Sequence, residues 1–114
     1  MKTWEEKLTF YDEIIATNDK FKRLGKTMPY TAANTHMFSL FNKAGEIGMR
    51  LSKEDGESFM KDHDTTNYKS YGAVMKNYVL IPEHIYSNMD LLAATLEKSY
   101  QYAMSLKANP RKKK

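Results

Sequence analysis

The sequence predicts an α+β domain in which helices pack against one antiparallel sheet, with the element order α-β-β-β-α-β-β-α. Three observations predict this class. Apolar residues recur at helical spacing near both ends of the chain, residues 27–51 and 65–81 show the short alternating pattern of strands, and glycines or prolines separate these segments. A length of 114 residues suits a single domain. We expect that domain over residues 1–106 and a basic tail over 107–114.

The first helix is expected from the start of the chain to about residue 15. Thr3 is a suitable N-cap, and Glu6 three positions later completes a capping-box pattern. The apolar stripe of this helix repeats at spacings of four, three and four residues, and it consists of Trp4, Leu8, Tyr11 and Ile15.

A second, short helical stretch is expected after Asn18. Phe21 and Leu24 are the apolar residues that suggest it, because they are three positions apart. Gly25 then supplies a stop signal.

Three short strands are predicted next. Pro29 can only start a strand or lie on an edge, because it has no backbone donor. Residues 30–34 and 37–41 are β-compatible, and residues 43–46 form a turn that contains the expected glycine. Residues 47–51 alternate between apolar and other residues, as a half-buried strand does.

The middle helix is predicted from Ser52, which acts as its N-cap, to about His63. Asp55 lies three positions after the cap, and Phe59 begins the apolar side. Gly56 lies inside this helix, where glycine costs about 1 kcal/mol relative to alanine.

The last part of the chain predicts two strands and a long helix. Residues 65–71 and 75–81 are the strands, and Pro82 ends the second one. A short helical turn is expected at 82–84. Asn88 then caps a helix to about residue 106, whose buried stripe is expected to be Leu92, Leu96, Ser99, Ala103 and Leu106.

Composition excludes several kinds of site. The sequence has no cysteine, which excludes disulfides, thiolate zinc sites, iron–sulfur clusters and cysteine nucleophiles. The N-terminus lacks the apolar region of a secretion signal, and the run at 78–81 is too short to span a bilayer. We therefore expect a soluble, cytoplasmic protein.

The basic charge is concentrated at the C-terminus. The formal net charge is +4, but five of the 18 bases lie in residues 107–114, where there is no acid; they are Lys107, Arg111, Lys112, Lys113 and Lys114. Residues 1–106 therefore hold 13 bases and 14 acids. These five residues are candidates for nonspecific phosphate contacts, and the alternative is a solubilising end.

No catalytic, cofactor-binding or metal-binding residues are assigned. His36, His63 and His84 form no metal-binding pair. The cluster at 62–64 is expected to be a solvated helix end, because adjacent helical residues point in different directions. Gly45 and Gly48 do not form a phosphate-binding loop and instead bracket a hairpin, where Gly48 marks a bulge or a close approach. No cofactor is expected, and a non-enzymatic protein is favoured.

The candidate interaction surface is a group of tyrosines and lysines on the last two predicted strands. Its residues are Tyr68, Lys69, Tyr71, Lys76 and Tyr78. Aromatic rings and cations on a sheet can stack nucleic-acid bases, and tyrosine is also enriched in protein interfaces. The plainer interpretation is that the rings pack at the edge of the core with their hydroxyl groups in water.

Methionine is abundant, and two interpretations are open. Five methionines occupy apolar positions, and they are Met37, Met49, Met60, Met75 and Met104. We expect them to fill the core, and the alternative is an adaptable groove for a partner.

Two stretches of the sequence carry a family resemblance. The first is His36-Met37-Phe38 with Gly45 and residues 48–51, and the second is the run 71–79 with Ile81-Pro82. Over residues 5–114 the chain resembles the N-terminal domain of the TfoX/Sxy family. The resemblance implies a secretion-chaperone-like α+β fold. It implies no catalytic residues.

The same resemblance implies the function that we expect. The family includes regulators of bacterial competence that act with the cyclic-AMP receptor protein, and these carry a second, C-terminal helical domain. We expect a protein-interaction or regulatory module that binds a protein partner or itself. The alternatives are a weak nucleic-acid-binding module, which would use the tail and the tyrosine-rich face, and a small ligand-binding or enzymatic domain with an unrecognised pocket.

Overall fold

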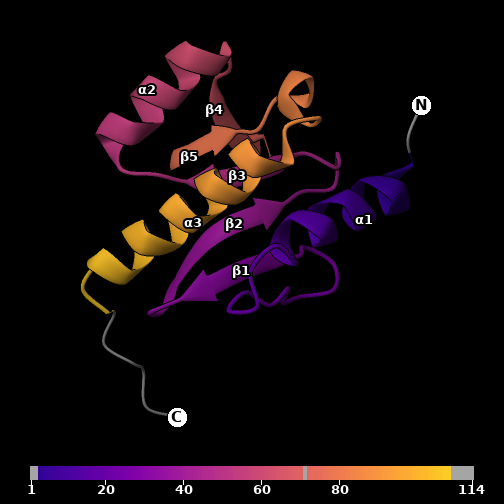
Figure 1. The fold of residues 1–114 in the computed structure, drawn as a ribbon, viewed down its shortest axis with the longest axis horizontal. Helices are drawn as coiled ribbons and strands as arrows, with labels where there is room; N and C mark the ends of the chain where they lie inside the picture. Colours follow the sequence, from indigo (N-terminus) through magenta and orange to yellow (C-terminus); the bar gives the residue numbers. More distant parts are fainter. Residues whose placement is uncertain (1–2, 71, 109–114) are drawn as a thin grey trace.

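The computed structural model describes residues 3–70 and 72–108, and over these residues it confirms the predicted α+β class and element order (Figure 1). The described elements are α1 (Trp4–Ile15), β1 (Tyr30–Ala33), β2 (His36–Phe41), β3 (Ile47–Arg50), α2 (Lys53–His63), β4 (Asn67–Ser70), β5 (Ala73–Leu80), the 3₁₀ helix η1 (Glu83–Ile85) and α3 (Met89–Ser105).

The strands form one antiparallel sheet in the order β1-β2-β3-β5-β4. The main core lies between one face of this sheet and the helices. It combines side chains from all three described α-helices, such as Tyr11, Phe59 and Leu96, with Ile47 and Met49 of β3. The opposite face of the sheet is covered by no described helix, and we call it the open face.

The predicted helix caps are confirmed. In the capping box of α1, the Glu6 amide donates to Thr3 Oγ1 at 3.1 Å and the Thr3 amide donates to Glu6 Oε1 at 2.9 Å. Ser52 caps α2 and Asn88 caps α3 through their side-chain oxygens. Such caps satisfy amides that have no partner within the helix. None of the described helices is long and apolar enough to cross a membrane.

The short helical stretch predicted after Asn18 is wrong. The chain makes turns there, and Leu24 pairs with Tyr30 through two backbone hydrogen bonds of 2.8 and 3.0 Å. Phe21 packs its ring against Phe38 at a centroid distance of 5.4 Å. Two apolar residues are too few to bury a helix face, so these tertiary contacts decide the local conformation.

A β-bulge in β2 decides which side chains reach the open face. The β1–β2 register shifts at Phe38, which has no partner on β1. Phe38 and Ser39 consequently both face the helices, where Ser39 Oγ lies 2.6 Å from the Tyr11 hydroxyl. Met37 and Leu40 face the other way and join the open face.

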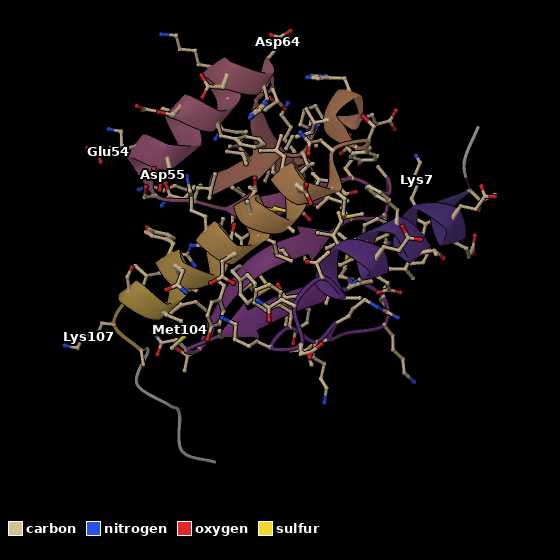
Figure 2. All side chains as sticks on the ribbon, viewed as in Figure 1. Lys7, Glu54, Asp55, Asp64, Met104 and Lys107 are labelled. Carbon is tan, nitrogen blue, oxygen red and sulfur yellow. The ribbon has the colours of Figure 1, made fainter. Side chains whose placement is uncertain are left out.

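The methionines divide between the two faces. Met49 is fully buried in the main core, as expected, and Met60 packs against that core. Met37 and Met75 lie on the open face instead. The prediction that Met104 fills the core is wrong, because its side chain on α3 is 47% exposed (Figure 2).

Candidate binding groove on the open face of the sheet

A second apolar cluster covers the open face. Leu40, Tyr68 and Tyr78 are its buried members, and the half-buried residues around them are Met28, Tyr30, Met37, Met75 and Leu80. The cluster joins residues that lie on β2, β4 and β5 and at the start of β1. Because no described helix covers it, several of its large apolar side chains stay partly in contact with water.

Gly48 makes room for the centre of this cluster. It lies in β3 between Leu40 of β2 and Leu80 of β5. The Tyr68 ring lies against it, and a Cβ at Gly48 would lie 2.4 Å from the ring carbon Cγ. The close approach that the sequence suggested for Gly48 is therefore confirmed.

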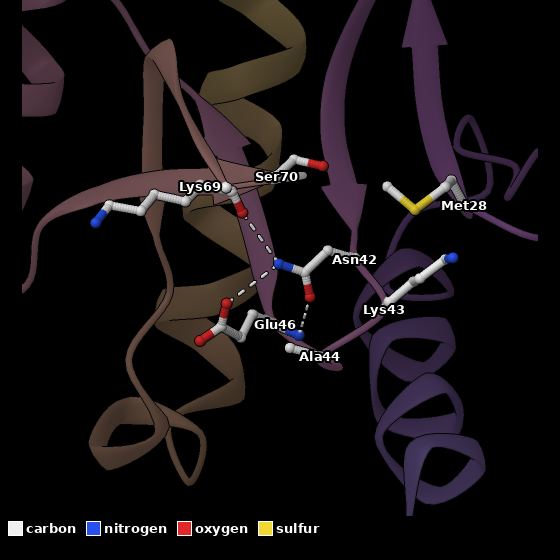
Figure 3. A pocket seen from close by; sticks show the side chains of 8 residues that line it. Met28, Asn42, Lys43, Ala44, Glu46, Lys69 and Ser70 are labelled. Atoms are coloured by element: carbon white, nitrogen blue, oxygen red, sulfur yellow. Dashed lines mark hydrogen bonds between the residues drawn. The ribbon is translucent and has the colours of Figure 1, made fainter.

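The sheet curls so that β4 comes close to the end of β2. In a flat sheet, β4 would lie three strand spacings from β2, roughly 14 Å away. Instead, Asn42 Nδ2, just after β2, donates to the Lys69 carbonyl of β4 at 3.1 Å (Figure 3). The β4–β5 ladder is irregular, and Asn77 has a φ of 68°, which is consistent with a bend in β5.

Asn42 is held by the turn between β2 and β3. Its Nδ2 also donates to Glu46 Oε1 at 3.1 Å, and its Oδ1 accepts from the Glu46 amide at 2.8 Å (Figure 3). The side chain is buried. Its amide group therefore connects the β2–β3 turn to the β4–β5 hairpin.

The concave face contains an apolar groove of about 430 Å³. We call this feature the groove, and it is lined by Met28, Tyr30, Met37, Leu40, Ser70 and Met75. A second pocket of about 270 Å³ adjoins it and shares Met28 and Ser70 with it. We call the second pocket the polar end, and its other lining residues are Asn42, Lys43, Ala44, Glu46, Lys69 and Gly72 (Figure 3).

Ser70 lies where the groove meets the polar end. Its side chain is more than nine-tenths buried, and its hydroxyl has no hydrogen-bond partner among the described residues. A buried hydroxyl without a partner costs about 1–3 kcal/mol. Ser70 is therefore an unsatisfied polar group in the wall that the two cavities share.

Tyr68 and Tyr78 of the predicted surface belong to the same apolar cluster as five of the six residues that line the groove. Tyr68 and Tyr78 are buried, so their rings are not exposed to a partner or to bases. Their hydroxyls are not in water either, because each donates to a backbone carbonyl at 3.1 Å. Burial raises the pKa of Tyr78 to about 12. Lys69 and Lys76 are exposed, and Tyr71 lies outside the described residues.

The predicted tail is described only at its start. The Lys107 side chain is exposed, and the His36 ring Nε2 lies 2.9 Å from the Lys107 carbonyl oxygen. A carbonyl oxygen only accepts, so the His36 Nε2 carries a proton in this contact. The other four bases of the predicted tail lie outside the described residues; they are Arg111, Lys112, Lys113 and Lys114.

The other histidines lie away from the groove. His63 ends α2, where its ring packs on Phe59 at a centroid distance of 4.6 Å. His84 is exposed on η1. Over residues 3–70 and 72–108, no three His, Cys, Asp or Glu side chains are grouped closely enough to hold a metal ion.

Charge is segregated between the strands and the helices. The strand segments 24–51 and 65–81 hold one acid, Glu46, and five bases: Lys26, Lys43, Arg50, Lys69 and Lys76. The helical segments 3–23, 52–64 and 82–106 hold 13 acids and seven bases. Figure 2 shows three of these acids, Glu54, Asp55 and Asp64, at the two ends of α2. The net charge of residues 1–106 is near zero, so the total does not reveal this separation.

Sequence reasoning identified only part of this site. Lys69 was predicted, whereas Met28, Asn42 and Ser70 were not. One available signal was the segment 37–41, which is apolar at both odd and even positions. A strand with that pattern places apolar side chains on both faces of a sheet.

Comparison with known proteins adds no assignment. No protein-family model matches the chain, and no curated protein matches it. The resemblance to the TfoX/Sxy family therefore stays a prediction.

Proposed function

We propose that this domain is a non-enzymatic protein-interaction module that binds an apolar segment of a partner polypeptide in the groove. The observation that supports the proposal is a concave, helix-free sheet face with five apolar side chains among its six lining residues. Grooves lined by large apolar side chains are typical of sites that bind other molecules.

The chemistry of the groove favours binding over catalysis. Three of its side chains are the thioethers of Met28, Met37 and Met75, which adapt their shape to different apolar partners. None of the three histidines lines it. The regulatory role that the TfoX/Sxy resemblance implies belongs to the same proposal, because regulation by such a domain would act through a bound partner.

The nucleic-acid alternative has less support. It combined the basic tail with exposed tyrosine rings for base stacking, and Tyr68 and Tyr78 are buried. The basic residues of the strands are compatible with phosphate contacts, but equally with acidic groups on a protein.

A titration with model peptides tests the proposal. The isotope-labelled protein is followed by amide NMR while a short peptide of alternating leucine and asparagine is added, and a serine–asparagine peptide serves as the reference. We expect only the leucine peptide to bind. The shifted amides should belong to residues 28–40 and 70–75 and not to α2.

Matched methionine variants locate the site. Glutamine has nearly the length of methionine but is polar. Met37→Gln and Met75→Gln should therefore each weaken binding of the leucine peptide by about tenfold. Met104→Gln makes the same change on the exposed side of α3 and should have no effect. Equal binding of the two peptides, or equal loss in all three variants, would contradict the proposal.

A further inference from the structure

We infer that the partner segment carries a carboxylate beside its apolar side chain, with the apolar group in the groove and the carboxylate at the polar end near Lys43, Lys69 and Ser70. This inference depends on the proposed function and specifies the chemistry of the partner. It combines two observations about the polar end with one about the charge of the strands.

The first observation is that two lysines flank the polar end. Both residues line it, and their side chains extend in opposite directions, away from each other (Figure 3). Neither lysine forms an ion pair with another described residue. The one acid there, Glu46, accepts a hydrogen bond from Asn42. The local excess of positive charge therefore favours an anionic group on the partner.

The second observation is the Ser70 hydroxyl. It lines both the groove and the polar end and has no partner among the described residues. A purely apolar ligand would leave this buried group without a hydrogen bond. A carboxylate oxygen at the junction would accept from it, and hydrogen bonds to an ionised acceptor are stronger than neutral ones.

The third observation is the charge of the strands as a whole. The segments that build the open face hold five bases and one acid, whereas the helical segments are acidic. Such a separation attracts an acidic segment toward the strands and repels it from the helices. An acidic peptide with apolar residues at alternate positions matches both the groove and its surroundings.

Three peptides that differ only in charge test the inference. They alternate leucine with aspartate, with asparagine or with lysine, and their dissociation constants are measured at low and high salt. We expect the aspartate peptide to bind about tenfold or more tightly than the lysine peptide at low salt. The difference should shrink at high salt, because salt screens exposed charges.

Two sets of variants test the residues. The double change Lys43→Glu and Lys69→Glu should reverse the preference between the aspartate and lysine peptides. The control double change Lys61→Glu and Lys98→Glu places the same charges on the exposed sides of α2 and α3. It should preserve the preference for the aspartate peptide over the lysine peptide. Ser70→Ala should weaken binding of the aspartate peptide more than binding of the asparagine peptide, because the neutral amide oxygen is the weaker acceptor. Circular dichroism confirms that each variant is folded.

The possible failures are distinguishable. Equal binding of all three peptides, with Met75→Gln weakening each of them, would overturn the carboxylate inference and leave the proposed function standing. Binding of none would overturn both. Self-association that Met75→Gln abolishes would show that a second copy occupies the groove. The protein could also bind single-stranded DNA more tightly than any of the peptides. If Lys43→Glu with Lys69→Glu abolished that binding, the surface would be assigned to nucleic acid. Either of these last two results would overturn the inference.

Discussion

The ring of Tyr68 in β4 lies against the backbone of Gly48 in β3, although β5 separates these two strands in the order of the sheet. The contact is possible because position 48 has no side chain. It also aims the Tyr68 hydroxyl at the Glu46 carbonyl, 3.1 Å away. Together the two residues form the buried base of the open face.

Gly48→Ala should therefore destabilise the domain. The added Cβ would meet the Tyr68 ring at 2.4 to 2.7 Å. Overpacking of this kind costs about 1–3 kcal/mol in the free energy of unfolding, which urea denaturation measures. In a double-mutant cycle with Tyr68→Leu, the two effects should not add, because the smaller side chain relieves the clash. Strict additivity would contradict the contact.

Gly56→Ala should have the opposite effect. Gly56 lies inside α2, and a Cβ there would make ordinary contacts with Val79 at 3.5 Å and Leu51 at 3.9 Å. Alanine loses less backbone entropy than glycine on folding, so we expect stabilisation of about 0.5–1 kcal/mol. The measurement is the shift of the thermal or urea midpoint.

Gly72→Ala is the matched control for this change. Position 72 also has open space for a Cβ, but its φ is +76°, a conformation that alanine disfavours. This variant should lose about 1–2 kcal/mol. If both alanines changed stability in the same direction, backbone conformation would not be the deciding factor.

Asn42→Asp should loosen the β4–β5 hairpin. The change replaces the Nδ2 donor with an oxygen that faces the Lys69 carbonyl and the Glu46 carboxylate. Loss of these buried hydrogen bonds, with added repulsion, should cost about 2–3 kcal/mol. Hydrogen exchange should accelerate for the amides of β4 and β5 more than for those of α3. Asn42→Ala removes the bonds without the repulsion and should cost less.

Stability should fall as the pH rises above 10. Burial raises the pKa of Tyr78 from 10.0 to about 12 in the folded protein, so the folded state favours the neutral phenol. Both states are protonated well below pH 10, where the contribution is complete. Between pH 10 and 12 the unfolded chain ionises first, and the contribution is lost.

A urea midpoint measured at a series of pH values tests this dependence. In Tyr78→Phe the decline above pH 10 should be less steep, by on the order of 1 kcal/mol per pH unit. The variant also loses the hydrogen bond to the Met37 carbonyl, so it should be less stable at neutral pH. An unchanged slope would show that this phenol does not contribute to alkaline unfolding.

Local patterns predicted much of the fold. Thr3, Ser52 and Asn88 cap the helices as expected, because a cap depends on residues three positions apart. The apolar stripe of α3 is buried at Leu92, Leu96, Ser99 and Ala103. The segment around Phe21 was mispredicted, because its contacts come from residues far along the chain.

The groove could be predicted only in fragments. Lys69 was recognised as part of a surface. Tyr68 and Tyr78 beside it were expected at the edge of the core with their hydroxyl groups in water, but both are buried and their hydroxyls donate to backbone carbonyls. The reason is that a ring can pack against Gly48 only once β4 has curled toward β3. No pattern in residues 65–81 encodes the position of a glycine in another strand.

The sequence by itself determined the order of helices and strands, their caps and the separation of charge along the chain, since these depend on neighbouring residues and on composition. The tertiary structure alone decided which side chains share the open face. A one-residue bulge at Phe38 changes the face of every later side chain in β2, and the curl of the sheet brings the Lys69 carbonyl within hydrogen-bond distance of Asn42. Both features arise from pairing between distant strands, so they appear only when the chain is folded.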